Sequence, residues 1–273
     1  MDRINYFKNR PKASSIDVDA YLKRIHQQKE TPSLGYLRQL HRAHLMHIPF
    51  ENLDIHYNRK IILDYSKIFQ KIITKQRGGY CYELNGLFFH LLYHLGFDPF
   101  IISARVRNTD GKAYGKDFDH MAIIVKLDQE EYLVDVGFGK GIIYPKKIED
   151  GLIQMDYTDY WRIVKDIDDN FLLQSSDNAS VFSPKYLFRK EARELIQFLE
   201  MNEFQQNNPQ STFQQQKMIT RLTDTGRITL TDRTFKEFKL GLINEVAISN
   251  EDEFLSLLEQ HFGIPSAQLT RLD

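Results

Sequence analysis

One cysteine, one histidine and one aspartate of this chain are of the residue types that form a nucleophilic triad. Cys81 is the only cysteine among 273 residues, and it lies between a glycine turn that follows Arg77 and an apolar helical pattern. A thiol at the first turn of a helix lies near the positive end of the backbone dipole, which lowers its pKa and favours the thiolate. Because a lone cysteine is more often a small buried side chain, the case for a nucleophile depends on its partners.

His120 and Asp135 are the expected partners, because a β-hairpin would bring them together. His120 begins the apolar run HMAIIVKL, and Asp135 lies within YLVDVGFG, where an unpaired carboxylate would be costly to bury. If residues 128–129 form a two-residue loop, His120 is paired with Gly137 and lies diagonal to Asp135 on the same face. The imidazole could then take the thiol proton, the carboxylate could fix the tautomer of the imidazole, and the sulfur could carry an acyl group as a thioester.

The elements that must position these residues change in type along the chain. Apolar positions at helical spacing dominate the first third and include a helix that begins near Cys81 and ends at Gly96. Alternating strand patterns follow from Pro99 onward, interrupted by a helix over about residues 191–204. A further hairpin and a last helix capped by Asn250 complete the chain. Helices followed by strands and then by a mixed segment predict an α+β fold.

Composition excludes several classes of function. Lys and Arg (36) balance Asp and Glu (37), with no basic stripe, so we expect no binding to nucleic acid. The polar N-terminal segment predicts no export signal, and no apolar run approaches the roughly 20 residues of a membrane span. A single cysteine excludes an internal disulfide framework and a cysteine-based zinc cluster. A lone thiol without an export signal predicts a reducing, cytoplasmic location.

Four elements of the sequence together resemble the arylamine N-acetyltransferase family. They are RGGYCYELNGLF (Arg77–Phe88), HIPFENLDI (His47–Ile55), His120 and DVGFG (Asp135–Gly139). The resemblance covers nearly the whole chain and implies three parts with a cysteine-protease-like Cys-His-Asp triad. Those parts are an N-terminal helical bundle (residues 1–96) that carries Cys81, a central β-barrel-like domain (97–205) that carries the histidine and the aspartate, and a C-terminal α/β lid (206–273).

The resemblance also implies a reaction. Acetyl-CoA would acetylate Cys81, and the thioester would pass its acetyl group to an arylamine, an arylhydroxylamine or a hydrazine, in a ping-pong sequence without a metal. Phe50 and Phe138 match residues that line the acceptor pocket, whereas Glu51 and Arg77 match a structural pair that braces the loop before the cysteine. Acetyl-CoA and a small-molecule acceptor are therefore the expected partners, and nothing in the sequence indicates an oligomeric state.

Two other interpretations of the same residues stay open. A papain- or transglutaminase-like cysteine hydrolase uses the same three residue types in the same order, although the segment PFENLDI has no hydrolytic role that we can identify. A non-catalytic binding paralogue would have kept the fold and lost turnover, but all three triad residues are present. Hydrolysis without an acceptor amine would favour the first alternative, and ligand binding without acylation of Cys81 would favour the second.

Overall fold

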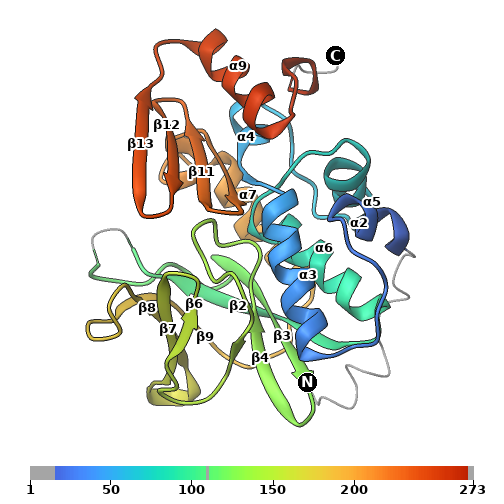
Figure 1. Ribbon diagram of the computed structural model, residues 1–273, viewed down its shortest axis with the longest axis vertical. Coiled ribbons are helices and arrows are strands. Elements are labelled where there is room, and N and C mark those ends of the chain that lie inside the picture. The colour runs from blue at the N-terminus through green and yellow to red at the C-terminus, as the bar shows by residue number, and fades with distance from the viewer. Residues whose placement is uncertain (1–15, 109–110, 270–273) are drawn as a thin grey trace.

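The computed structural model describes residues 16–108 and 111–269 and shows helices packed against two antiparallel sheets (Figure 1). The larger sheet lies in the lower half of the view, most helices lie at the upper right, and the smaller sheet lies at the upper left. Residues 1–15, from which the sequence predicts the absence of an export signal, lie outside the described residues. Within the described part, no helix is long and apolar enough to cross a bilayer.

Short, capped helices make up the N-terminal part. Their bounds are α2 (Val18–Arg24), α3 (Leu34–His47), α4 (Leu53–His56), α5 (Tyr65–Phe69), which continues as a π-helical turn η1 (Gln70–Thr74), and α6 (Cys81–His94). The side chains of Asp17, Ser33 and Asp64 accept a backbone hydrogen bond at the starts of α2, α3 and α5. Tyr21 and Leu22 of α2 are buried, as the helical spacing of apolar residues in the first third of the chain predicts.

The larger sheet has eight strands in the order β5-β4-β3-β2-β9-β8-β7-β6 and forms a barrel-like layer (Figure 1). Their bounds are β2 (Asp98–Val106), β3 (His120–Leu127), β4 (Glu130–Val134), β5 (Lys146–Lys147), β6 (Gln154–Asp156), β7 (Asp159–Lys165), β8 (Phe171–Ser176) and β9 (Ser183–Phe188). The hairpin of β3 and β4 turns at Asp128 and Gln129, whose φ values of 50° and 67° suit a type I′ turn. Ile123 is paired with Val134, which confirms the predicted register, but β4 ends there, one residue before Asp135, so the predicted pairing of His120 with Gly137 does not form.

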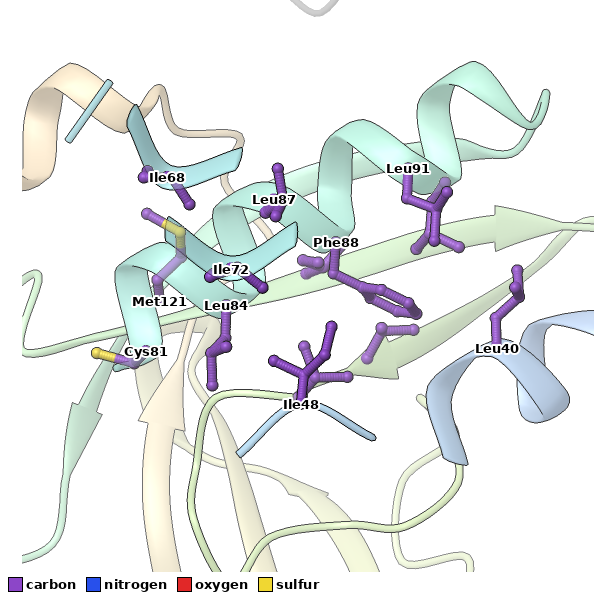
Figure 2. Packing of buried hydrophobic residues seen from close by; sticks show 14 of the residues in the cluster. Leu40, Ile48, Ile68, Ile72, Cys81, Leu84, Leu87, Phe88, Leu91 and Met121 are labelled. Atoms are coloured by element: carbon purple, nitrogen blue, oxygen red, sulfur yellow. The ribbon is translucent and has the colours of Figure 1, made fainter. Parts of the chain in front are cut away.

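Helix α6 is apolar on most sides because it runs through the interior against β2 and β3. Figure 2 shows Cys81 at its first turn, with the sulfur pointing away from the apolar side chains that follow along the helix. Those side chains include Leu84, Phe88 and Leu91, all of which are buried. The predicted end of the helix is confirmed, because Gly96 follows it with a φ of 92°.

The smaller sheet has the order β1-β10-β11-β12-β13. Its strands are β1 (Phe50–Glu51), β10 (Met218–Thr223), β11 (Gly226–Thr231), β12 (Thr234–Lys239) and β13 (Leu242–Ala247). The first strand comes from the part that the sequence predicts to be helical, and Phe50 is paired with Thr220. A two-residue strand is too short to show alternation. The last two strands are also not predicted, and β13 is exposed along its whole length, so burial imposes no alternation on it.

Three helices and three 3₁₀ turns complete the structure. They are η2 (Ile167–Asp169), η3 (Leu195–Phe198), α7 (Leu199–Asn207), α8 (Thr212–Gln215), α9 (Glu251–Phe262) and η4 (Ser266–Gln268). The helix predicted over about residues 191–204 therefore begins later, as a 3₁₀ turn, and ends later. The predicted cap of the last helix is confirmed, because Asn250 accepts a bond of 3.0 Å from the backbone N–H of Glu253.

The apolar core joins the parts of the fold. Its largest cluster contains the buried face of α6, side chains of β3 such as Ile123 and Val125, and Leu222 of β10. A second cluster lies within the larger sheet around Trp161, and a third lies between the smaller sheet and α9 around Phe254. The predicted α+β class is confirmed, whereas the domain boundaries at 96/97 and 205/206 stay a prediction.

Candidate active site

Cys81 begins α6, and chain segments approach it where glycine leaves room. A Cβ at Gly78 would lie 2.1 Å from the carbonyl oxygen of Pro49, and a Cβ at Gly137 would lie 2.8 Å from the Cα of Cys81. Neither distance is possible for a real side chain, so these two positions require glycine. The cysteine itself is enclosed, with 2% of its surface exposed.

His120 and Asp135 meet as the hairpin register predicts. Nε2 of His120 lies 2.7 Å from Oδ2 of Asp135, and both residues are buried. Cys81 lines the same cleft as His120, and His120 acts on the thiol pKa through a hydrogen bond and through its charge. Because Asp135 engages Nε2, the nitrogen that faces the thiol is Nδ1. The structure therefore brings the three predicted residues together in the order thiol, imidazole, carboxylate.

Four donors surround the carboxylate of Asp135. Oδ1 accepts bonds from Nδ2 of Asn85 (2.9 Å) and from the backbone N–H of Gly137 (3.0 Å). Oδ2 accepts bonds from His120 and from the hydroxyl of Tyr186 (3.0 Å). Burial alone would raise the pKa of Asp135, but the charge of His120 and these hydrogen bonds lower it below its ordinary value. The carboxylate is therefore charged and fixed in orientation.

Asp135 in turn gives His120 a strong affinity for a proton. Burial alone would lower the pKa of His120, but the charge of Asp135, its hydrogen bond and the bond to Cys81 raise that pKa to about 10. Part of this rise comes from the hydrogen bond and the charge of Cys81 as thiolate, so the imidazole can hold at neutral pH the proton that the thiol gives up.

The pKa of the thiol itself differs from the prediction. Burial raises the pKa of Cys81, and the hydrogen bond and charge of His120 oppose this rise without cancelling it. The lowered pKa expected from the helix start is therefore wrong in direction, because desolvation of the enclosed thiol outweighs the other contributions. Formation of the thiolate then depends on His120 rather than on the helix.

A cleft of about 450 Å³ reaches the thiol. Phe50 and Phe138, the predicted acceptor-binding residues, both line it beside Cys81 and His120. The ring of Phe138 makes an edge contact with the His120 ring at a centroid distance of 5.1 Å. Phe213 of α8 lines the same cleft, so aromatic rings from three parts of the chain surround the entrance to the thiol.

Two cations also line this cleft. Lys140 and Arg227 contribute to its wall, and Arg227 donates a bond of 3.2 Å to the hydroxyl of Thr220. Within the described residues, neither forms an ion pair with a carboxylate. The cleft therefore combines apolar rings with positive charge.

Glu51 and Arg77 form a buried ion pair next to the loop that leads to the thiol. Nη2 of Arg77 lies 2.7 Å from Glu51 and 2.9 Å from Asp54. Lys71 extends the network, with Nζ 2.8 Å from Asp54 and 2.9 Å from Glu83. Burial raises the pKa of Glu83 to about 7, although Lys71 opposes the rise. The expected pair is thus part of a larger network that joins β1, α4 and the start of α6.

Sequence reasoning missed two residues that donate hydrogen bonds to the carboxylate of Asp135. Asn85 lies one helical turn after Cys81 on α6, and this spacing could have identified it, since residues four apart share a helix face. Tyr186 lies on β9, and no local pattern distinguishes it from the other apolar positions of that strand. Only the pairing of β9 with β2 brings it next to the triad.

Comparison with known proteins shows the family of the chain. A family model described as N-acetyltransferase matches residues 33–269. The arylamine N-acetyltransferase / N-hydroxyarylamine O-acetyltransferase of Salmonella typhimurium is 30% identical over 90% of this chain and 88% of its own length. The arylamine N-acetyltransferase of Mycolicibacterium smegmatis is 29% identical over 95% of this chain and 96% of its own.

Solved structures give the same result. The arylamine N-acetyltransferase of Salmonella typhimurium superimposes with a TM-score of 0.85, covering 90% of each chain. An arylamine N-acetyltransferase of Bacillus cereus, 26% identical, superimposes with a TM-score of 0.84 over 92% of this chain and 100% of its own, and is described as having a Cys-His-Glu catalytic triad. The chain belongs to the arylamine N-acetyltransferase family.

Proposed function

We propose that this protein transfers an acetyl group from acetyl-CoA to an arylamine, an arylhydroxylamine or a hydrazine through a thioester on Cys81. The observation that carries the proposal is the contact of the thiol with an imidazole that Asp135 supports, at the end of a cleft lined by aromatic rings. A thiol nucleophile that has to stay reduced also favours a cytoplasmic location.

The first half-reaction forms the thioester. His120 takes the thiol proton, and the sulfur attacks the carbonyl carbon of the acetyl group. The tetrahedral intermediate expels the thiolate of CoA, which takes the proton back from the imidazolium. Asp135 holds the charged imidazole throughout these steps, and Asn85 and Tyr186 hold Asp135.

The second half-reaction uses the same groups in the opposite direction. After CoA leaves, the amine nitrogen attacks the thioester carbon of acetyl-Cys81, and His120 takes a proton from that nitrogen. The sulfur departs as thiolate and recovers its proton from the imidazolium. One binding cleft therefore serves both substrates in turn, which gives ping-pong kinetics.

Different residues of the cleft bind the two substrates in this proposal. Phe50 and Phe138 bind the aromatic ring of the acceptor, which stacks or makes edge contacts with them. Lys140 and Arg227 supply positive charge for the phosphates of CoA. Glu51 and Arg77 do not touch the substrates and brace the loop that carries the nucleophile.

Steady-state kinetics with an arylamine panel test this function. Release of free CoA should require both acetyl-CoA and an amine, and double-reciprocal plots at several amine concentrations should be parallel. Release of CoA at the same rate without an amine would instead support the cysteine-hydrolase alternative. Binding of acetyl-CoA without any acylation of Cys81 would support a non-catalytic paralogue.

A further inference from the structure

His41 of α3 has no part in the proposed chemistry, yet it contacts the main chain of the triad. The residue is completely buried. Its Nε2 lies 3.1 Å from the backbone nitrogen of Asp135, and its Nδ1 lies 2.8 Å from the carbonyl oxygen of Ile143. The ring thus joins α3 to both ends of the segment that follows β4.

These two partners determine the tautomer of the ring. A backbone N–H can only donate, so Nε2 of His41 accepts, and a carbonyl oxygen can only accept, so Nδ1 carries the hydrogen. His41 is therefore neutral. Burial lowers its pKa to about 4, with Lys146 acting in the same direction and with Ile143 and Asp135 opposing.

His41 accepts a hydrogen bond from the backbone N–H of Asp135, for which the sheet provides no acceptor. Strand β4 ends at Val134, whose pairing with Ile123 is the last one in the ladder. The N–H of Asp135 is buried just beyond that end, and without His41 it would lose its hydrogen bond. This N–H and the carboxylate belong to one residue, so His41 fixes the main chain from which the carboxylate reaches His120.

We propose that His41 is a positioning residue for acyl transfer, which acts by holding the main chain of Asp135 so that its carboxylate keeps its bond to His120. This inference rests on the proposed function. The role proposed for His41 differs from general packing, because it depends on the hydrogen bond that Nε2 accepts and on the hydrogen bond that Nδ1 donates.

The chain offers a matched control. His44 lies one turn further along the same helix and is also completely buried. Its Nδ1 lies 2.7 Å from the hydroxyl of Tyr21, and its Nε2 has no hydrogen-bond partner among the described residues. Both rings make edge contacts with Phe88. His44→Phe therefore removes a buried histidine hydrogen bond from the same environment without touching Asp135.

The experiment measures acetylation of Cys81 by acetyl-CoA in His41→Phe, His41→Gln, His41→Asn and His44→Phe. In His41→Phe the rate should fall about tenfold or more, since a buried donor loses its acceptor. His41→Gln should retain more activity than His41→Asn, because only the longer side chain carries its amide oxygen to the position of Nε2. The rate in His44→Phe should stay within about twofold of wild type.

A second readout needs no substrate. Alkylation of Cys81 by iodoacetamide should shift to higher pH in His41→Phe, because a displaced Asp135 supports the charged His120 less and His120 then lowers the thiol pKa less. If wild type is not acetylated, the proposed function fails, and the alkylation profile still tests His41. Equal rates and profiles in His41→Phe and wild type, or equal losses in His41→Phe and His44→Phe, would overturn the inference. If His41→Phe does not fold, equal rates of Cys81 acetylation in His41→Gln and His41→Asn would overturn the inference.

Discussion

Replacement of Asp135 by asparagine tests the electrostatic core of the site. The pKa of His120 is raised from 6.5 to about 10, which corresponds to about 5 kcal/mol in favour of the charged imidazole. Asp135→Asn removes the charge responsible, while the burial that lowers the pKa remains. We expect His120 to be neutral at pH 7 in the variant.

The hydrogen bonds around the new amide also select the wrong tautomer. The backbone N–H of Gly137 can only donate. The Oδ1 of Asn85 accepts a bond from Val136, so its Nδ2 faces residue 135 as a donor. Both groups therefore require an acceptor from residue 135. The amide oxygen of the new residue must face them, and its NH₂ group must face His120. Nε2 of His120 then accepts, Nδ1 carries the hydrogen, and the imidazole cannot take the proton of Cys81.

Both effects act on the first half-reaction. We expect acetylation of Cys81 to slow about 10³- to 10⁴-fold, the loss that follows a wrong tautomer in a serine triad. The assay is a rapid-mixing measurement of the CoA released in the first turnover, without an acceptor. Asp156→Asn is the control, because it also replaces a buried carboxylate by an amide. This carboxylate lies away from the thiol, with Oδ2 of Asp156 3.1 Å from Nζ of Lys146.

The two variants separate catalysis from folding. Both should lower the midpoint of urea unfolding, since each breaks a buried ion pair. Only Asp135→Asn should slow acylation. A folded Asp135→Asn protein that releases CoA within about fivefold of the wild-type rate would refute the role of the carboxylate.

Three further predictions concern the cleft, the loop and the pH dependence of folding. Phe138→Ala should change the ranking among arylamine acceptors more than the rate of Cys81 acetylation, whereas Phe182→Ala, a ring that lies under Arg162, should change neither; collapse of acetylation with an unchanged ranking would contradict the pocket assignment. Arg77→Lys should lower the free energy of unfolding by about 1.5–3 kcal/mol, because lysine keeps the charge but cannot make the forked contacts to Glu51 and Asp54; a urea titration that gives the same loss for Arg162→Lys, whose arginine bonds Gln174, would contradict this. The thermal midpoint should be highest near pH 7. His120 has a folded pKa of about 10, so its contribution to stability is complete below pH 6.5 and is lost as the pH rises toward 10. His41 and His90 have folded pKa values of about 4, so their contribution is complete above pH 6.5 and is lost as the pH falls toward 4. A profile whose alkaline side is unchanged in His120→Asn would show that this histidine does not contribute.

The parts of the site that follow from local pattern could be predicted from the sequence. The hairpin register depends only on the turn at Asp128 and Gln129 and on the alternation of its strands, so the meeting of His120 and Asp135 follows from the sequence alone. The roles expected of Phe50 and Phe138 came instead from the family resemblance, because an aromatic residue next to a motif is in itself as consistent with core packing.

The parts that depend on distant contacts could not be predicted. The pKa of Cys81 follows from how completely the fold encloses the thiol, and the helix start alone suggested the opposite direction. Tyr186 and His41 reach Asp135 from β9 and α3, which are separated from it by many residues. The pairing of Phe50 with β10 likewise depends on a strand at the other end of the chain.

The thioester on Cys81 is tested most directly by the mass of the protein after incubation with acetyl-CoA alone. We predict one added acetyl group, located by peptide mapping on Cys81, and its loss when an arylamine is added. Cys81→Ala should take up no acetyl group under the same conditions. Acetylation of Cys81→Ala at the wild-type level, or release of CoA without any acetylated cysteine, would contradict the thioester on which the proposed reaction depends.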